Sequence, residues 1–303
     1  CYVAIKEFFP KKWASRENGK SRRVAFYQDD ESKKIVEECL HNFRHEAKIL
    51  EKIKDVPYIA RLKDYFPENE TEYIVLSLVQ GETLSDYVKK RSGKLPAAEA
   101  LSYIQYTFDT LKYLHGMGII HRDISPGNLM ISEDQVLYLI DFGSATSFDG
   151  KEEFQSEQVF EHKGLQAPEH SRPDMQGPWT DIFSLCATIV YLITGEGIAE
   201  AEERMLLDEL PQRLMKTSLS SRQQNALMRG LNPNINYRFA DIEGLHAELY
   251  GEALTADNLP KEWNVFYHAK TDIGSRKINQ DNFMVDTVFY YKGEDCEQAG
   301  TLT

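Results

Sequence analysis

The sequence predicts an α+β fold, with strands concentrated in the N-terminal part and helices after them. Runs rich in β-branched and aromatic residues at 2–6, 59–66 and 73–79 are typical of strands. Apolar residues that recur every three or four positions from Ile35, and again from Leu101, predict amphipathic helices. The chain has 303 residues, which is enough to bury a sizeable core.

The composition narrows the class of protein. The formal net charge of −13 argues against nucleic acid as the main partner, because phosphate backbones are bound by clustered Lys and Arg. The four cysteines lie far apart without paired metal spacing, which indicates thiols in a reducing compartment and predicts a cytoplasmic protein. The longest apolar run, 186–194, is too short to span a bilayer, so we expect a core helix and no membrane segment. No signal peptide is visible, and a chain that begins with Cys1 is expected to lack its true N-terminus.

The first strand and the first helix each carry a charged residue of interest. Lys6 ends the strand-like run 2–6, and Glu46 lies beside the apolar stripe of the helix. The stripe consists of Val36, Leu40, Phe43, Ala47 and Leu50. Between strand and helix, the basic stretch 11–23 is expected to be a solvated surface loop.

The next elements are a hairpin and a long helix. Residues 59–66 and 73–79, separated by a polar turn at 67–71, predict two antiparallel strands. Thr83 then occupies a helix-capping position. The later helix has a core-facing stripe and is expected to end at 115–118, where glycines can release the chain. That stripe consists of Leu101, Ile104, Phe108, Leu111 and Leu114.

The residues with the strongest chemical signal follow this helix. Asp123 and Asn128 lie on one loop, and two short strands, 129–132 and 136–140, bring Asn128 and Asp141 to neighbouring strand ends. Phosphoryl transfer from ATP needs a carboxylate that orients the attacking hydroxyl and oxygen ligands that hold magnesium. The pattern therefore predicts this reaction, with ATP and Mg²⁺ as cofactors.

The motif 121–128 together with Asp141-Phe142-Gly143 resembles the signature of protein kinases. The resemblance implies a two-lobed, protein-kinase-like α+β fold, with a small β-rich lobe that is incomplete at its N-terminus, a large helical lobe and a C-terminal β extension. It implies that Asp123 is the catalytic base and that Asn128 and Asp141 are metal ligands. Lys6 would contact the ATP phosphates and pair with Glu46; the alternative is two unrelated solvated charges.

The same resemblance implies a nucleotide site. Leu76 would guard the back of the adenine pocket, and residues 77–79 would form the hinge. The implied cofactor-binding residues are Ala4, Lys6, Leu76, Ser77, Val79, Asn128, Met130 and Asp141. A glycine-rich loop should precede Val3, so we expect this chain alone to bind ATP weakly.

Other positions correspond to structural residues of kinases. His121 is expected to pack beneath Phe142, Glu169 to pair with Arg238, and Asp181 to hold the backbone of the 121–128 loop.

The segment 143–167 resembles an activation segment. Arg122 is expected to meet a phosphate there, or alternatively to form a local salt bridge. The candidate phosphorylation sites are Ser144, Thr146, Ser147 and Ser156, although surface hydroxyls are common.

Two departures concern the acceptor and the source. Ser125 stands where serine/threonine kinases usually carry Lys, and Glu161-His162 replaces the usual Gly-Thr. The element 7–10 is similar to one that follows the strand Lys in a subgroup of bacterial kinases, in which the same Ser occurs. The resemblance therefore implies a bacterial source.

The C-terminal part has its own resemblance. Residues 1–250 would form the kinase domain, 251–262 read as a linker, and 263–303 show strand and turn signals. Arg276 and Asp281 are similar to the phosphate-binding Arg and metal-associated Asp at the start of type 2C metal-dependent protein phosphatases, although Gln280 stands where Glu is usual. The alternative is an arbitrary β-hairpin extension.

These observations favour a protein kinase that transfers the γ-phosphate of ATP to Ser or Thr of protein substrates. A catalytically silent, kinase-like scaffold is the alternative, favoured by the expected absence of the glycine-rich loop and by Ser125. A small-molecule phosphotransferase is disfavoured by the motif at 167–169, which resembles a protein-substrate feature.

Overall fold

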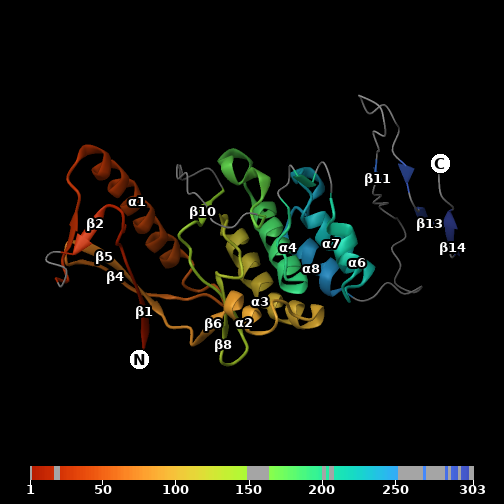
Figure 1. Cartoon of the computed structure of the whole chain (residues 1–303), viewed down its shortest axis with the longest axis horizontal. Coiled ribbons are helices and arrows are strands. Elements are labelled where there is room, and N and C mark those ends of the chain that lie inside the picture. The colour runs from red at the N-terminus through yellow and green to blue at the C-terminus, as the bar shows by residue number, and fades with distance from the viewer. Residues whose placement is uncertain are drawn as a thin grey trace. The chain divides into compact units, whose positions relative to one another are not determined.

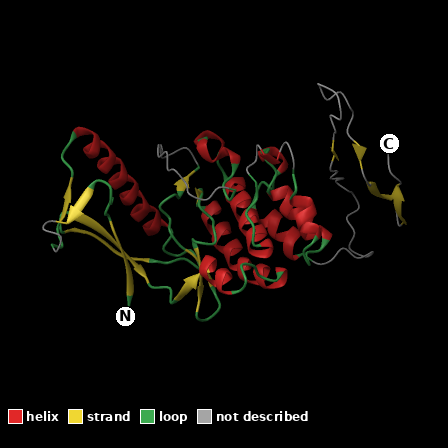
Figure 2. Cartoon of the chain, viewed as in Figure 1, coloured by secondary structure: helices red, strands yellow, loops and turns green. Residues whose placement is uncertain are grey.

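The chain divides into two units, Cys1–Tyr250 and Gly251–Thr303, each of which is described on its own. The computed structural model describes residues 2–16, 21–148, 164–199, 203–204 and 208–251, together with four short strands between 269 and 299. Within the first unit, strands gather in an N-terminal small lobe, from β1 to β5, and helices in a large lobe, from β6 to α8 (Figures 1 and 2).

The small lobe is built on a three-stranded antiparallel sheet. Its order is β1-β5-β4, formed by β1 (Val3–Glu7), β5 (Thr71–Ser77) and β4 (Leu62–Glu68). Asn69 and Glu70 both have positive φ, 55° and 59°, and this two-residue turn matches the twist of the strands that it joins. Pro67 is tolerated in β4 because β4 is the edge strand. The predicted hairpin is confirmed, with strand ends shifted by a few residues.

Helix α1 (Asp30–Lys52) begins earlier than its apolar stripe. The side chain of Asp29 accepts a hydrogen bond from the Ser32 N–H at 2.9 Å, and Asp30 and Glu31 in the first turn favour the helix dipole. Of the predicted stripe, Val36, Phe43, Ala47 and Leu50 are buried, and Leu40 is partly buried against the core.

The expectation of a solvated loop at 11–23 is wrong in part. Strands β2 (Ala14–Arg16) and β3 (Val24–Phe26) pair as an antiparallel hairpin. Phe8 is 5% exposed and packs on Phe26, with ring centroids 5.7 Å apart, and on Phe43, at 5.6 Å. The apolar residues here are too few for a recognisable period, so burial against α1 decides the structure.

The large lobe begins with α2 (Leu84–Lys90), and the side chain of Thr83 caps it, as predicted, by accepting from the Asp86 N–H at 3.1 Å. Helix α3 (Ala97–Gly116) buries its whole predicted stripe and ends where the sequence indicates, with Gly118 at φ 74°. Two small sheets follow, with orders β6-β8-β9 and β7-β10. Their strands are β6 (Gly81–Thr83), β7 (Ile119–Ile120), β8 (Leu129–Ser132), β9 (Leu137–Leu139) and β10 (Thr146–Ser147).

The centre of the large lobe is α4 (Pro178–Thr194), which confirms the predicted core helix. It is apolar and buried on nearly all sides, and it ends at Gly195 in the left-handed region. Around it lie the 3₁₀ turns η2 (Pro168–Ser171), η3 (Pro173–Met175) and η4 (Ile235–Tyr237) and the helices α6 (Leu210–Met215), α7 (Ser221–Gly230) and α8 (Ile242–Tyr250). Within the described ranges, no helix is long and apolar enough to cross a bilayer.

In the second unit the structure describes two strand pairs. β11 (Ala269–Lys270) pairs with β12 (Met284–Val285), and β13 (Val288–Lys292) pairs with β14 (Asp295–Ala299), both antiparallel. Arg276, Gln280 and Asp281, on which the phosphatase resemblance depends, lie outside the described residues.

Candidate active site

The loop between β7 and β8 carries the predicted base and one predicted metal ligand. The Asn128 Nδ2 donates to the Asp123 carbonyl at 2.9 Å and to the Asp123 carboxylate Oδ2 at 2.7 Å. The Asn128 N–H also donates to the Ser125 carbonyl at 3.0 Å. Because the amide nitrogen of Asn128 is engaged, its amide oxygen is the atom left for a cation.

A buried carboxylate on α4 holds this loop, as predicted for Asp181. Its two oxygens accept from the backbone N–H groups of His121 at 2.9 Å and Arg122 at 2.8 Å, and it lies 2.9 Å from His115 Nε2. Burial of Asp181 would raise its pKa, but the interactions with His115 and His121 outweigh burial, so the pKa is lowered. Asp181 therefore fixes the loop as a charged anchor.

Asp141 lies at the end of the neighbouring strand. The Ile140 N–H donates to the Asn128 carbonyl at 2.9 Å, which places the two predicted metal ligands on adjacent chain segments. Asp141 has φ 61°, and its Oδ1 accepts from Lys6 Nζ at 3.0 Å and from the Gly143 N–H at 3.2 Å. Behind it, the ring of Phe142 packs edge-on against His121 with centroids 4.9 Å apart, which confirms the predicted packing.

Lys6 joins the small lobe to this strand end. Its Nζ donates to both carboxylate oxygens of Glu46, at 2.9 and 2.7 Å. The Lys6 side chain is 39% exposed, whereas that of Glu46 is 3% exposed. Burial lowers the pKa of Lys6, but the charges of Glu46 and Asp141 outweigh it and the pKa is raised. Lys6 therefore stays cationic beside a partly open carboxylate.

Burial and the Lys6 charge also compete at Asp141. Burial would raise the pKa of Asp141, and the nearby Lys6 lowers it further than burial raises it. Asp141 is thus an anion at neutral pH, with its side chain 48% exposed. The structure brings Lys6, Glu46 and Asp141 into one cluster, and Asp123 and Asn128 into a second that is joined to it by the backbone bond at Ile140.

Half-buried positions hold the residues predicted to contact the adenine or to lie in the hinge, Ala4, Leu76, Ser77, Val79 and Met130. Ala4 lies opposite Leu76 in the β1–β5 ladder, on the same face of β1 as Lys6. The Ser77 Oγ accepts from the Arg61 N–H at 2.8 Å, so this side chain supports the strand connection. Val79 follows β5, and Met130 lies in β8 opposite Thr83.

The oxygen donors at this site suit a magnesium ion whose remaining ligands come from phosphate and water. Among the described residues, no group of three or more His, Cys, Asp or Glu could hold a metal by itself. Asn128 and Asp141 supply two oxygen donors, and Mg²⁺ is commonly bound by one or two such side chains together with water and substrate phosphates. These residues therefore suit a metal that arrives with a nucleotide.

Arg122 is buried and bonded to neutral groups. It is 5% exposed, with its Nε donating to the Ser144 carbonyl at 2.6 Å and its Nη1 to Gln176 Oε1 at 3.3 Å. Both acceptors are uncharged, so these contacts with described residues are not the local salt bridge that was the alternative. The expected contact with a phosphate on the activation segment stays a prediction.

The candidate phosphorylation sites also need correction. Ser144 and Thr146 are buried, at 7% and 6% exposure, and this burial closes them to a kinase in this conformation. Ser147 is half-buried, and Ser156 lies outside the described residues.

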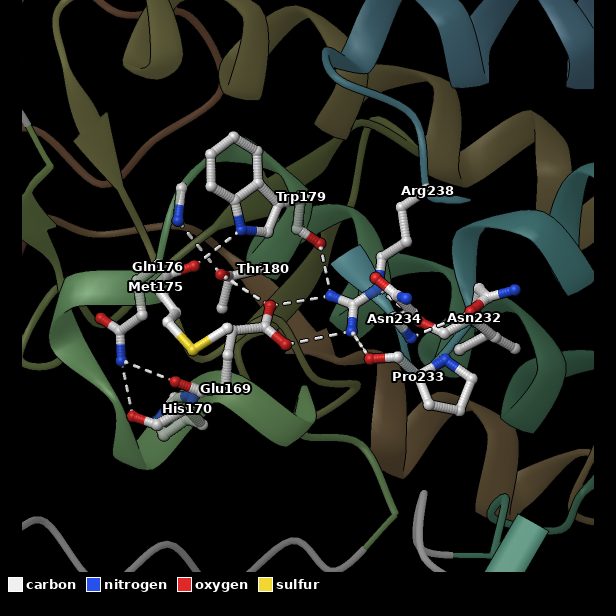
Figure 3. A network of polar contacts seen from close by, with 12 residues as sticks. Glu169, His170, Met175, Gln176, Trp179, Thr180, Asn232, Pro233, Asn234 and Arg238 are labelled. Carbon is white, nitrogen blue, oxygen red and sulfur yellow. Dashed lines mark hydrogen bonds and ion pairs between the residues drawn. The ribbon is translucent and has the colours of Figure 1, made fainter. Parts of the chain in front are cut away.

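The predicted Glu169–Arg238 pair is confirmed (Figure 3). The two guanidinium nitrogens of Arg238 lie 2.7 and 3.0 Å from the Glu169 oxygens, with side-chain exposures of 0% and 1%. Thr180 donates its hydroxyl to Glu169 at 3.0 Å, and Figure 3 shows Gln176 and Trp179 beside the pair. The pair fixes η2, the end of the activation segment, to the base of the lobe.

Sequence reasoning missed the contacts of Gln176, Thr180, Arg44 and Glu72. Neither periodicity nor a local motif marks these contacts, and those of Arg44 with Glu72 and of Gln176 with Arg122 join residues that are distant in sequence. The long-range contacts that could be predicted were those of residues that belong to a known motif.

Comparisons with known proteins show the family and the fold of the chain. Residues 14–241 match the model of the protein kinase domain. The chain is 32% identical over 178 residues to the serine/threonine-protein kinase PknA of Mycobacterium tuberculosis, a match that covers 57% of the chain and 41% of PknA. It is 26% identical over 229 residues to the serine/threonine-protein kinase PrkC of Bacillus subtilis, covering 73% of the chain and 35% of PrkC. The chain thus spans less than half the length of these relatives.

A solved structure, PpkA-294 in its apo form, is also similar. It has a TM-score of 0.69 and 25% sequence identity, and the match covers 82% of this chain and 86% of that one. The two-lobed fold predicted from the sequence is confirmed.

Proposed function

The chain belongs to the protein kinase domain family, and from this premise we propose that it transfers the γ-phosphate of ATP to Ser or Thr hydroxyls of protein substrates. The observation that carries the proposal is the Lys6–Glu46–Asp141 cluster next to the Asp123–Asn128 loop. Such a set provides a cation for the phosphates, oxygen donors for a metal and a carboxylate for the acceptor. The serine/threonine kinases PknA and PrkC support the acceptor class.

Each side chain has a proposed role. Asp123 orients the acceptor hydroxyl through the carboxylate oxygen that Asn128 leaves available, and takes its proton as the bond from the hydroxyl oxygen to the γ-phosphorus forms. The bond from the γ-phosphorus to the β–γ bridging oxygen breaks in the same transfer, and ADP is the leaving group. Lys6, held by Glu46, neutralises phosphate charge. Asn128 and Asp141 would hold magnesium, which when bound neutralises charge that develops on the transferred group.

The nucleotide is proposed to lie between the lobes' facing edges, as in other kinases. Ala4 and Leu76 would contact the adenine from the small lobe, with Met130 on the large-lobe side. The backbone of Ser77 to Val79 would bond its polar edge, which requires no particular side chain.

The domain organisation, source and location of the parent protein are also proposals. Residues 1–250 would be the kinase domain, 251–262 a linker and 263–303 the start of a type 2C phosphatase domain, on the evidence of Arg276 and Asp281 in the sequence. The bacterial relatives favour a bacterial source, and the scattered thiols favour the reducing cytoplasm.

A radiolabelled ATP assay on the complete natural polypeptide, followed by phosphoamino-acid analysis, tests the function. We expect Asp123→Ala and Asp141→Asn to lower phosphotransfer at least about 100-fold while circular dichroism and the unfolding midpoint stay close to wild type. Asp134→Asn, in the exposed turn between β8 and β9, is the matched control and should keep full activity. Undiminished transfer by folded Asp123→Ala would refute the role of the base. An inactive wild-type polypeptide would favour the scaffold.

A further inference from the structure

A second ion pair joins α1 to the small-lobe sheet, away from the phosphate-binding Lys6. Arg44 on α1 faces Glu72 on β5: its Nε lies 2.9 and 3.1 Å from the two carboxylate oxygens, and its Nη2 lies 2.5 Å from Oε1. The Tyr65 hydroxyl on β4 donates to the other oxygen of Glu72. The guanidinium fork of Arg44, Nε and Nη2, thus closes on Oε1, and Nε also reaches the second oxygen, so the contact fixes direction as well as distance.

Three neighbouring contacts fall within one turn of α1. Phe43 packs on Phe8, Arg44 binds Glu72, and Glu46 binds Lys6. Their sheet partners are also neighbours, because the Phe8 N–H donates to the Glu72 carbonyl at 2.9 Å across β1 and β5. The same turn of helix that carries Glu46 is therefore attached both to the end of β1, the strand that carries Lys6, and to the neighbouring strand β5.

The two ion pairs have opposite polarity. The helix supplies the cation at Arg44 and the anion at Glu46, whereas the sheet supplies the anion at Glu72 and the cation at Lys6. A movement of α1 along its axis that separated Glu46 from Lys6 would also separate Arg44 from Glu72. It would bring Arg44 toward Lys6 or Glu46 toward Glu72, which like charges oppose.

Burial makes this second pair more than a surface contact. The side chain of Glu72 is 9% exposed although that of Arg44 is 53% exposed. Burial acts to raise the pKa of Glu72, but the bonds from Arg44 and Tyr65 lower it further, so the carboxylate stays charged. Without Arg44, a mostly buried anion would lose its cation, and α1 would lose a directional attachment.

We propose that Arg44 and Glu72 are positioning residues that hold α1 in the register in which Glu46 engages Lys6. They act through the ion pair and touch neither nucleotide nor acceptor. The inferred role depends on the phosphotransfer proposed above, for which Lys6 must be held in place.

A double-mutant cycle on the complete polypeptide tests the pair: Arg44→Gln, Glu72→Gln and both together, with kcat and the KM for ATP measured well below the unfolding midpoint. We expect each single change to lower kcat/KM about tenfold, and the double change to lower it no further, because the two side chains act as a unit. Arg44→Lys keeps the charge without the fork and should lie between wild type and Arg44→Gln.

Arg91→Gln is the matched control. It breaks another Arg–Glu pair, Arg91–Glu99 at 2.6 Å, whose Arg is 51% exposed and which lies in the large lobe. It should leave kcat/KM unchanged. A purely structural role of Arg44 and Glu72 would lower the unfolding midpoint and leave kcat/KM at wild type, which would overturn the proposal, as would single effects that multiply in the double variant.

Hydrogen exchange of α1 separates this inference from the proposed function. Glu72→Gln should speed exchange of the backbone amides around Phe43 to Glu46, and Arg91→Gln should not. If the wild-type protein transfers no phosphate, the proposed function fails, while exchange still decides whether the pair holds the helix. Unchanged exchange in Glu72→Gln would overturn the positioning role even in an active enzyme.

Discussion

Glu169→Gln is expected to destabilise the large lobe strongly. The substitution keeps the shape of the side chain and its contact with the Thr180 hydroxyl, but removes the charge opposite Arg238. Arg238 has a side chain that is 0% exposed, so its guanidinium would be left as a buried cation without its anion. Removing one partner of a buried pair typically costs about 3–5 kcal/mol.

The hydrogen bonds that remain to Arg238 place the loss in the free energy of unfolding at the lower end of that range. Three carbonyls still accept from the guanidinium: Asn232 at 2.6 Å, Trp179 at 3.2 Å and Pro233 at 3.3 Å. We therefore expect a loss of about 3 kcal/mol in the free energy of unfolding. In a domain of this size that corresponds to a fall in Tm of roughly 6–12 °C.

Guanidinium denaturation followed by tryptophan fluorescence measures the loss, since Trp179 lies beside the pair. Glu196→Gln is the control, because Glu196 is 74% exposed and 3.5 Å from Arg213, and it should cost less than about 0.5 kcal/mol. The double variant Glu169→Gln/Arg238→Met should cost less than the sum of the two single changes. A loss below about 1 kcal/mol for Glu169→Gln would refute the reasoning.

Two further predictions concern the core and the loop anchor. Gly230→Ala would place a Cβ 2.3 Å from the Cys186 Sγ, so we expect the free energy of unfolding, measured by denaturation, to fall by about 1–3 kcal/mol. Cys186→Ala should relieve this clash. Equal losses with Cys186 and with Ala at position 186 would contradict the explanation. Asp181 has a lowered pKa in the folded protein, so its stabilisation is present above its unfolded pKa near 3.8 and is lost as pH falls through the lower folded value. Acid unfolding should therefore be steeper in wild type than in Asp181→Asn, and identical pH profiles would show that the anchor is not charged.

Local sequence patterns predicted the elements that have a strong apolar period or an end marked by glycine. The five apolar positions of α3 recur over a long helix, and glycines mark its end, so both its face and its end could be predicted. The β2–β3 hairpin could not, because strands of three residues carry no measurable alternation, and their burial depends on Phe8 and α1. The formation of this hairpin is therefore determined by tertiary contacts and not by the local sequence pattern.

The same distinction holds within the site. Asp123, Asn128 and Asp141 lie in two short motifs whose spacing reflects their joint chemistry, so sequence placed them. The buried state of Arg122 was not predictable, because its acceptors, Ser144 and Gln176, come from elsewhere in the chain and include a backbone carbonyl. A motif predicts which side chains have a function, whereas the tertiary fold determines which atoms those side chains contact.

The two halves of the candidate active site are held in place by different interactions. On the large-lobe side, Asp181 is 0% exposed and fixes the Asp123 loop through backbone bonds, so that half moves only if the core of the lobe opens.

On the small-lobe side, Lys6 is 39% exposed, and its alignment with Asp141 of the large lobe, which is 48% exposed, depends on α1 through Glu46. Charges this open to water interact weakly and are screened by salt. The Lys6–Asp141 contact therefore adds little to this alignment. Helix α1 is held instead at the buried ends of its contacts, by Phe43 on Phe8 and by the carboxylates of Glu46 and Glu72, which are 3% and 9% exposed. A change that loosens this turn of α1 is therefore expected to disturb the alignment of Lys6 while the Asp123 loop stays fixed.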